Sequence, residues 1–494
     1  MSRRQHPHKK RLEKGYLVSK NSKLSPLTRD AVRQFLSQNT FRLTPRSETE
    51  SSSSNVGLVG VEIEMLPLRG KDYSGIPQLQ GQQESILSWI LPLGDELKWK
   101  QKTEPKENSP GQVVVTLLEL PEGDNVSFEP GGQVEISSKP YASQVEMVSR
   151  VRQLRTQITT ALGFHGVNLV GIGYNPIATT DQVGLQMAKK RYRAMDAYFE
   201  TIGPYGRQMM RQTCTVQVCL DFGSDQETMA KRFWVGQMIA PIAAAIFANS
   251  PIVNRKPAGI VGHRSKIWRN IDSSRTGLLF PKTKLMDSLT AQACVETYER
   301  FLLESKVIFI QALDYEVPKN LTFGTWLAEG YKGIFPNEAD LELALSLLFS
   351  EVRPRGFFEF RSVDNQHPVW QFVPTVFWST LMYSEGALNQ AWELLAPLQS
   401  RLPELLKRSE QGLKDPELSS LSQRLVAIVE QHLETLPTAF RDKTIEHDFR
   451  RFCDRYTLKG RTPGDELIEL LGQSQGDLGS GFWSRLNEKL ARGM

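Results

Sequence analysis

Alternation of apolar and other side chains is the clearest pattern in the first third of this chain. Residues 56–66 read VGLVGVEIEML, which predicts a strand with Glu62 and Glu64 on one face and apolar residues on the other. Similar patterns predict further strands at 113–118, 167–174, 212–222 and 356–363. The turn PEGDN at 121–125, after the strand predicted at 113–118, predicts a hairpin.

Helical spacing of apolar residues marks other segments. Seven apolar residues recur at this spacing between residues 143 and 162, which predicts an amphipathic helix packed on the sheet. Helices are also expected at about 189–202 and 226–248, and the pattern stays helical beyond about residue 386. The polar stretch KTEPKENSPG at 102–111 predicts a loop. The expected fold class is α+β, with active-site residues on antiparallel strands and a helical C-terminal region.

Charge separates the start of the chain from the rest. The net charge is +5, but residues 1–50 hold 12 Lys and Arg against 4 acids, and the remaining residues hold 48 against 51. This basic start and the following SETESSSSN predict a mobile arm and linker over residues 1–55. A solvated tail is favoured over a nucleic-acid-binding one, because few aromatic residues are present to stack on bases.

Hydropathy and cysteine usage narrow the class of protein. The longest apolar stretch, at 238–248, is interrupted by Pro241, so no segment reaches the roughly 20 residues of a membrane span. The four cysteines lack CxxC spacing, which argues against a zinc site. Cys214 and Cys219 would point to opposite faces of a strand, which argues against a local disulfide. The expected compartment is therefore the cytoplasm. An organelle transit sequence stays open, whereas a secretory signal is not expected because the start lacks an apolar core.

Carboxylates in apolar strand segments are the main chemical signal. Glu129 and Glu135 flank a Pro-Gly-Gly turn in SFEPGGQVEISS at 127–138, and Glu359 lies in another predicted strand. If these three converge with Glu62 and Glu64, their mutual repulsion calls for divalent cations, and all-oxygen ligands indicate Mg²⁺ or Mn²⁺. The alternative is that each glutamate faces solvent and that Pro-Gly-Gly is only a turn.

Arginines in two other stretches add positive charge to this set. They lie in HRSKIWRN at 263–270 and in FEFRSVD at 358–364, where Glu359 and Arg361 share a strand face. Guanidinium groups beside cation-binding carboxylates suit phosphate transfer to an acid substrate, although each arginine has a structural salt bridge as its alternative. The chain contains neither a P-loop nor a dinucleotide fingerprint.

At this point an ordered series of motifs resembles a known family. The chain is similar to glutamate–cysteine ligases of the plant and proteobacterial kind, and to actinobacterial enzymes that make γ-glutamylcysteine for ergothioneine. The resemblance covers about residues 57–385 and is carried, in order, by GVEIE, SFEPGGQVEIS, GIGYNP, KRYRAMDAYF, GRQMMRQTCTVQVCLDF, FANSPIV, HRSKIW, DSSRTG and EVRPRGFFEFRSVD. TPGDELIELL, near the end, is similar to the family's C-terminal helix.

The resemblance implies a fold, a reaction and roles for residues. It implies a glutamine-synthetase-like curved sheet lining a funnel, a catalytic domain at 56–385 and a helical region at 386–494 packed on it. It also implies that ATP phosphorylates the γ-carboxylate of glutamate and that the amine of cysteine then displaces phosphate, as in a first step toward glutathione or a related thiol. Cation ligands would be Glu62, Glu64, Glu129, Glu135, Gln217 and Glu359. Catalysis would use Arg361 and Glu359, and substrate binding would use Arg264, Trp268 and Gln133.

Departures from the family pattern leave the amine acceptor open. Met65-Leu66 stands where plant-type members tend to carry Lys-Phe, Ala344 replaces a His, and Met187-Ala188-Lys189 replaces Met-Pro-Lys. Two alternatives follow: a ligase that joins glutamate to another amine, and an inactive binding protein. The expected partners are glutamate, cysteine and ATP, with no membrane or nucleic acid, and the oligomeric state stays open.

Overall fold

A nine-stranded antiparallel sheet organises the structure, which is a computed structural model describing residues 27–43, 56–81, 84–105, 113–187 and 189–491. Its main path runs through eight strands in this order: β12 (Val352–Pro354), β13 (Phe358–Phe360), β7 (Val216–Leu220), β1 (Val59–Arg69), β5 (Val134–Ser137), β4 (Asn125–Phe128), β3 (Val113–Glu119) and β2 (Lys100–Pro105). The path ends at β12 and β2, so the sheet is open. Two short pairs lie outside this sheet: β8 (Ile252–Val253) with β9 (Lys256–Pro257), and β10 (Thr276–Gly277) with β11 (Phe349–Ser350).

Strand β1 is the central strand and has three partners. Its first half pairs with β5 on one side and β7 on the other, and its second half pairs with β6 (Val167–Val170). The strand predicted at 56–66 is thus confirmed and extends to residue 69. The other predicted strands are also confirmed, and the hairpin through PEGDN joins β3 to β4. Those at 167–174, 212–222 and 356–363 are shorter than expected.

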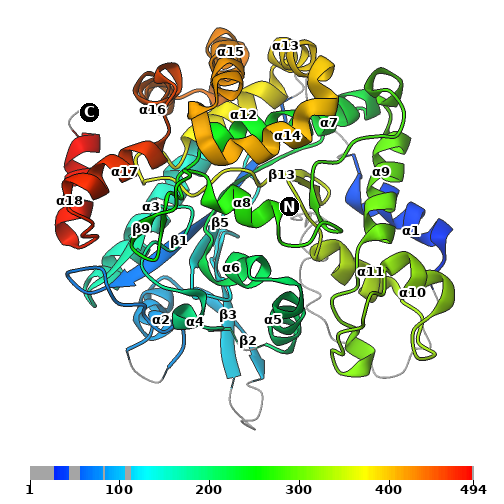
Figure 1. Cartoon of the computed structure of the whole chain (residues 1–494), viewed down its shortest axis with the longest axis horizontal. Helices are drawn as coiled ribbons and strands as arrows, with labels where there is room; N and C mark the ends of the chain where they lie inside the picture. Colours follow the sequence, from blue (N-terminus) through cyan, green and yellow to red (C-terminus); the bar gives the residue numbers. More distant parts are fainter. Residues whose placement is uncertain (1–26, 44–55, 82–83, 106–112, 188, 492–494) are drawn as a thin grey trace, which may run out of the picture.

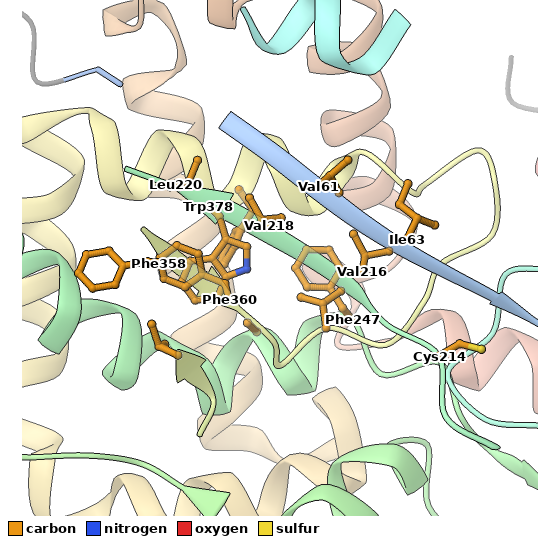
Figure 2. Close-up of a cluster of buried hydrophobic side chains, with 14 of the residues drawn as sticks. Val61, Ile63, Cys214, Val216, Val218, Leu220, Phe247, Phe358, Phe360 and Trp378 are labelled. Atoms are coloured by element: carbon orange, nitrogen blue, oxygen red, sulfur yellow. The ribbon is translucent and has the colours of Figure 1, made fainter. Parts of the chain in front are cut away.

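One face of the sheet is the apolar core. Figure 2 shows the side chains of Val61 and Ile63 from β1 on the same side as those of Val216 and Val218 from β7. They pack with Phe358 and Phe360 of β13 and with rings from the helices behind, where Phe360 stacks on Trp378 at 4.1 Å between ring centroids. Because side chains alternate along a strand, burying these residues turns their polar neighbours to the opposite face.

Helices cover both faces. The apolar face carries α3 (Gln144–Gly163), α7 (Gln226–Ile246) and α12 (Val373–Tyr383), whose buried residues belong to the same core as the sheet. The polar face carries α6 (Tyr205–Gln212) and α8 (His263–Arg269), which contact the Pro-Gly-Gly turn and the residue after β13. Both lie near the centre of the view in Figure 1. The helices predicted at 143–162, 189–202 and 226–248 are confirmed, the second as α5 (Lys190–Ile202).

The C-terminal region is helical, as predicted. After α12 the chain forms α13 (Glu385–Leu395), α14 (Leu402–Arg408), α15 (Pro416–His432), α16 (Lys443–Arg455), α17 (Pro463–Gln473) and α18 (Ser480–Ala491). Figure 1 shows α12 to α16 along the top and α17 and α18 at the left. Buried residues from α13 to α18 belong to the core cluster that includes the sheet. The division of the chain at residue 386 stays a prediction.

Two expectations about the N-terminal half need correction. Residues 27–43 belong to the predicted mobile arm, but they form α1 (Arg29–Phe35) and a turn of π-helix (Leu36–Thr40), and Val32, Leu36 and Phe41 are buried. Residues 100–105 form β2, although 102–111 were predicted as a loop. Pairing with β3 extends this polar segment. The rest of the arm, residues 106–111 and Ala188 lie outside the described residues.

The remaining helices complete the shell. They are α2 (Ile86–Glu96), α4 (Thr180–Val183), α9 (Ala291–Glu304), α10 (Phe323–Glu329) and α11 (Glu338–Ser346). No helix within the described parts of the chain has the length and hydropathy of a membrane span. All four cysteines are free thiols.

Candidate active site

Three carboxylates meet on the polar face, near the centre of the sheet. Glu64 on β1 lies directly opposite Glu135 on β5, and Glu129 follows the end of β4. Side chains directly opposite each other on antiparallel strands have Cβ atoms about 4.5–5.5 Å apart. One carboxylate oxygen from each of the three lies within 4.8 Å of the others. The convergence expected of these three acids is therefore present.

The Pro-Gly-Gly turn sets the position of Glu129 and Glu135. The amide of Gly132, whose φ is +86°, donates to the carbonyl of Glu129 at 2.8 Å. A Cβ on Gly131 would lie 2.1 Å from the carbonyl oxygen of Arg211 at the end of α6, so only glycine fits there. The turn is thus a close contact between the sheet and α6.

Gln133 connects the same turn to Thr213, which lies just before β7. Its Nε2 donates to the carbonyl oxygen of Thr213 at 3.0 Å. Its Oε1 is buried and has no hydrogen-bond partner within the described structure. A buried acceptor of this kind is available to a donor on a substrate, such as the ammonium group of an amino acid.

Hydrogen bonds satisfy only two of the carboxylates. Glu64 accepts from the amide of Thr215 at 2.8 Å and from Nε2 of Gln217 at 3.0 Å. Glu135 accepts from the hydroxyls of Ser127 and Ser137, at 2.7 and 2.8 Å.

By contrast, the side-chain carboxylates of Glu62 and Glu129 form no hydrogen bond or ion pair with a residue that the structure describes. Glu62 lies opposite Gln217 on one neighbouring strand and Ser137 on the other, so it belongs to the same face.

Burial and mutual repulsion raise the pKa of all four of these acids. Burial, then Glu135 and Glu359, raise the pKa of Glu62 to about 8. Burial, then Glu129, raise the pKa of Glu135 to about 7 and that of Glu64 well above its ordinary value. Glu129 is shifted upward by burial and by Glu62. Without a cation, the four acids therefore cannot all be charged at neutral pH.

The donor set fits a hard divalent cation. Carboxylate oxygens are the preferred ligands of Mg²⁺ and Mn²⁺, and two of the four carboxylates have no hydrogen-bond or ion-pair partner among the residues that the structure describes. A cation would favour the ionised form of each acid and remove their repulsion.

Glu359 is in the opposite electrostatic situation. Arg353 binds both of its oxygens, with Nε at 2.5 Å and Nη2 at 2.9 Å, and Nη1 of Arg361 binds one of them at 2.9 Å. Burial opposes its charged form, but Arg353, Arg361 and then Arg355 outweigh burial and hold the pKa well below its ordinary value. Glu359 is thus ionised and engaged by guanidinium groups in this structure.

Arg361 and Arg264 share one indole ring. Their guanidinium carbons lie 5.0 and 4.9 Å from the ring centroid of Trp268, and Nη2 of Arg264 donates to the carbonyl oxygen of Arg361 at 2.8 Å. Nη1 of Arg361 also donates to Oε1 of Gln217 at 2.9 Å. In each arginine, Nε is buried without a partner in the described structure. The pair is therefore positioned to bind an anionic group.

The residues expected at the site fall into two connected groups. The first contains the acids Glu62, Glu64, Glu129 and Glu135, and the second contains Glu359, Arg361, Arg264 and Trp268. Gln217 joins them, because its amide group contacts both Glu64 and Arg361. Ala344 lies elsewhere, in the lining of a small pocket that also includes Phe323 and Trp326.

Three polar residues of the site were not predicted. Arg353 faces Glu359 across the β12–β13 hairpin, and Arg355 lies at its tip. The glycine at position 356 could have indicated a hairpin turn in the sequence. A hairpin with this turn places Arg353 and Arg355 beside Glu359. Asn365 donates from Nδ2 to the carbonyl oxygen of Glu64 at 2.6 Å, a contact that the linear sequence does not signal.

Comparisons with known proteins place the chain in a family of ligases. The family model described as glutamate-cysteine ligase family 2 matches residues 96–482. The chloroplastic glutamate–cysteine ligase of Medicago truncatula is 31% identical over 364 residues, which cover 72% of this chain and 69% of that protein. The corresponding protein of Arabidopsis thaliana is 30% identical over 396 residues, covering 78% of this chain and 72% of that protein.

A solved structure is also similar. The glutamate–cysteine ligase of Francisella tularensis in complex with AMP has a TM-score of 0.48 at 12% identity, with 87% of this chain and 88% of that chain covered.

Proposed function

The chain belongs to glutamate-cysteine ligase family 2, and from this premise we propose that it joins the γ-carboxylate of glutamate to the amine of cysteine at the expense of ATP. The products are γ-glutamylcysteine, ADP and phosphate. The observation that carries this proposal is the placement of four acids and two indole-stacked arginines on one face of the sheet, joined through Gln217.

Cations are part of the proposal. The residues that would hold Mg²⁺ are Glu62, Glu64, Glu129 and Glu135, with Gln217 and Glu359 at the edge of the set. When bound, the cations would neutralise phosphate charge and polarise the reacting oxygens. Support comes from the raised pKa values of the acids and from the absence of protein partners for Glu62 and Glu129 in the described chain.

The arginines are proposed to bind the anionic groups. In the first step an oxygen of the glutamate γ-carboxylate attacks the terminal phosphorus of ATP, and the bond from this phosphorus to ADP breaks. We assign Arg361 to the transferred phosphoryl group, because its guanidinium connects Glu359 to Gln217. We assign Arg264 to the α-carboxylate of glutamate, beside the indole of Trp268 and with Gln133 as acceptor for the α-ammonium group.

In the second step the uncharged amine of cysteine attacks the acyl carbon and gives up one proton to the departing phosphate, which leaves with the bonding electrons and the bridging oxygen. Glu359 positions Arg361 throughout, because its ionised carboxylate fixes the guanidinium by a hydrogen bond of 2.9 Å. Burial of the acids and arginines limits water at the acyl phosphate, which would otherwise hydrolyse.

The proposal is tested by incubating the protein with ATP, Mg²⁺, glutamate and a mixture of amino acids, and identifying the product by mass spectrometry. We expect γ-glutamylcysteine, with ADP release that requires both glutamate and cysteine. A product with a different amine would keep the ligase chemistry and change the acceptor. ADP release that ignores glutamate, or no ADP from a folded sample, would contradict the proposal.

The cytoplasm is the proposed compartment. Four free thiols support a reducing environment. The named plant relatives are chloroplastic, so an organelle is the alternative location. Imaging of a C-terminally tagged protein in its own cells distinguishes the two.

A further inference from the structure

Residues 27–43 precede the span that matches the family model, which begins at residue 96, yet they contact the strands of the active site. Figure 1 shows α1 beside α9 at the right of the molecule. Three separate contacts, made by side chains of α1, by Phe41 and by the backbone of Thr40, connect this segment to the folded body.

The first contact is a pair of ion pairs to one buried acid. Nε of Arg29 and Nε of Arg33 lie 2.8 and 3.0 Å from the two carboxylate oxygens of Glu299 on α9. The side chain of Glu299 is only 3% exposed, and both of its oxygens are in ion pairs with these arginines. This contact holds α1 on α9.

The second contact is aromatic. The ring of Phe41 is 3% exposed and lies 5.5 Å from that of Phe233, 5.8 Å from Tyr298 and 6.1 Å from Phe222, measured between centroids. Phe222 and Phe233 in turn contact Phe358, the first residue of β13, at 4.4 and 5.8 Å. Phe41 therefore supports the strand that carries Glu359 from its apolar side.

The third contact reaches the tip of the β12–β13 hairpin. The amide of Gly356 donates to the carbonyl oxygen of Thr40 at 2.9 Å, and Gly356 has a φ of +80°. The turn itself is closed by a hydrogen bond of 2.8 Å from the amide of Arg355 to the carbonyl oxygen of Phe357. The segment thus binds the hairpin both beneath its strand and at its tip.

We propose that residues 27–43 form a brace that positions the β12–β13 hairpin for catalysis, and that Phe41 is its positioning residue. The hairpin brings two guanidinium groups to Glu359. Arg353 makes a bidentate contact, and Nη1 of Arg355 lies 3.7 Å from Oε1. The side chain of Arg355 is 49% exposed. Glu359 in turn orients Arg361, so the brace acts on the reaction through this chain of contacts.

The direct test compares hydrogen exchange in residues 352–360 between the full-length protein and its Phe41→Ala variant. We expect faster exchange in this peptide, because the variant loses the aromatic contacts beneath β13. Phe35→Ala is the matched control: Phe35 is a half-buried ring of the same segment, and no ring contact with Phe222, Phe233 or Tyr298 is present in the described structure. Unchanged exchange at 352–360 in a folded Phe41→Ala protein would overturn the brace.

The kinetic test rests on the proposed ligase activity, whereas the exchange test does not. Misplacing a catalytic group by about 1 Å can reduce a rate by up to roughly 100-fold, so we expect Phe41→Ala to lower kcat about 10-fold. The KM for glutamate should change less than about twofold, because Arg264 and Gln133 are on other elements.

Two further variants separate positioning from general stability. Phe41→Leu keeps an apolar side chain of similar size and should recover most of kcat. The double variant Arg29→Gln, Arg33→Gln changes only partly exposed side chains and removes the ion pairs that hold α1 on α9. It should lower kcat as Phe41→Ala does. Equal kcat in the Phe41→Ala, Phe35→Ala and parent proteins, measured below their melting temperatures, would show that the segment only adds stability.

Discussion

Individual acids on one sheet face differ in charge because their neighbours differ. Glu62 and Glu129 are partly buried beside other carboxylates and have raised pKa values. Glu359 is fully buried, but Arg353 and Arg361 hold its pKa low. Burial alone therefore does not determine the state of a carboxylate, and the two groups have different expected roles: cation binding for the first and positioning of arginine for the second.

Removing one of the crowded acids should separate stability from function. We expect Glu129→Gln to lower Mg²⁺-dependent ligation at least roughly 100-fold, because a charged cation ligand is lost. The same change should raise the metal-free free energy of unfolding by about 1 kcal/mol, because it removes repulsion with Glu62 and Glu135. Enzyme assays and urea unfolding in EDTA measure the two effects.

Glu119→Gln is the control for this experiment, since Glu119 lies on the same sheet in an exposed ion pair with Lys102. It should change the free energy of unfolding by less than about 0.5 kcal/mol and leave activity intact. Full activity of Glu129→Gln in saturating Mg²⁺ would remove Glu129 from the cation site.

The contact between Arg353 and Glu359 depends on shape as well as charge. Arg353→Lys keeps the positive charge but cannot bind both oxygens of Glu359 as a planar fork. We expect kcat to fall about 10-fold or more, with Arg361 less well held, while the KM for glutamate changes little. Steady-state kinetics decide this, and a lysine variant with the parent kcat would show that charge suffices.

At the level of elements, alternation in the sequence predicted which face of each strand is polar. It placed Glu62 and Glu64 on one face of their strand, and Glu359 with Arg361 on one face of theirs. What could not be predicted was the pairing between strands. The contact of Arg353 with Glu359 depends on hairpin register, and β2 is a strand only because β3 pairs with it. Both depend on tertiary contacts that a local pattern does not contain.

The Pro-Gly-Gly turn packs directly against α6 because Gly131 has no side chain. In Gly131→Ala the new Cβ would lie 2.1 Å from the carbonyl oxygen of Arg211, so the turn or α6 must move. We expect a loss of about 2–4 kcal/mol in the free energy of unfolding and a large loss of activity, because Glu129 and Glu135 move with the turn. Urea unfolding with parallel assays measures both.

Gly163→Ala provides the comparison, since no atom lies within 4 Å of its new Cβ and its φ is not positive. Its stability should stay within about 0.5 kcal/mol of the parent or rise slightly. If Gly131→Ala behaves in the same way, the close approach of α6 to the turn is not a constraint in solution.

At the scale of the whole molecule, the uncompensated acids should make stability depend on pH and on cations together. Glu62 and Glu135 have pKa values of about 8 and about 7 when folded, above their ordinary value of 4.5. Between pH 4.5 and about 8 the folded state therefore binds more protons than the unfolded state does. Their favourable contribution is complete below pH 4.5 and is lost as the pH rises through 7 to 8.

We therefore expect the melting temperature in EDTA to fall between pH 6 and pH 8.5, and the fall to disappear in excess Mg²⁺. Thermal unfolding followed by circular dichroism at each pH, with and without Mg²⁺, measures this. The double variant Glu62→Gln, Glu135→Gln should show a shallower profile in EDTA, with the remaining slope due to Glu64 and Glu129. A parent protein whose profile is the same in EDTA and in Mg²⁺ would contradict the cation site.

The central claim is that the acids and arginines on this sheet face support transfer of phosphate from ATP to a carboxylate of glutamate. The most direct measurement uses glutamate labelled with ¹⁸O in its γ-carboxylate, with ATP, Mg²⁺ and cysteine, and follows the inorganic phosphate by ³¹P nuclear magnetic resonance. We expect each phosphate to carry one ¹⁸O atom from the glutamate. Unlabelled phosphate formed alongside γ-glutamylcysteine would contradict it.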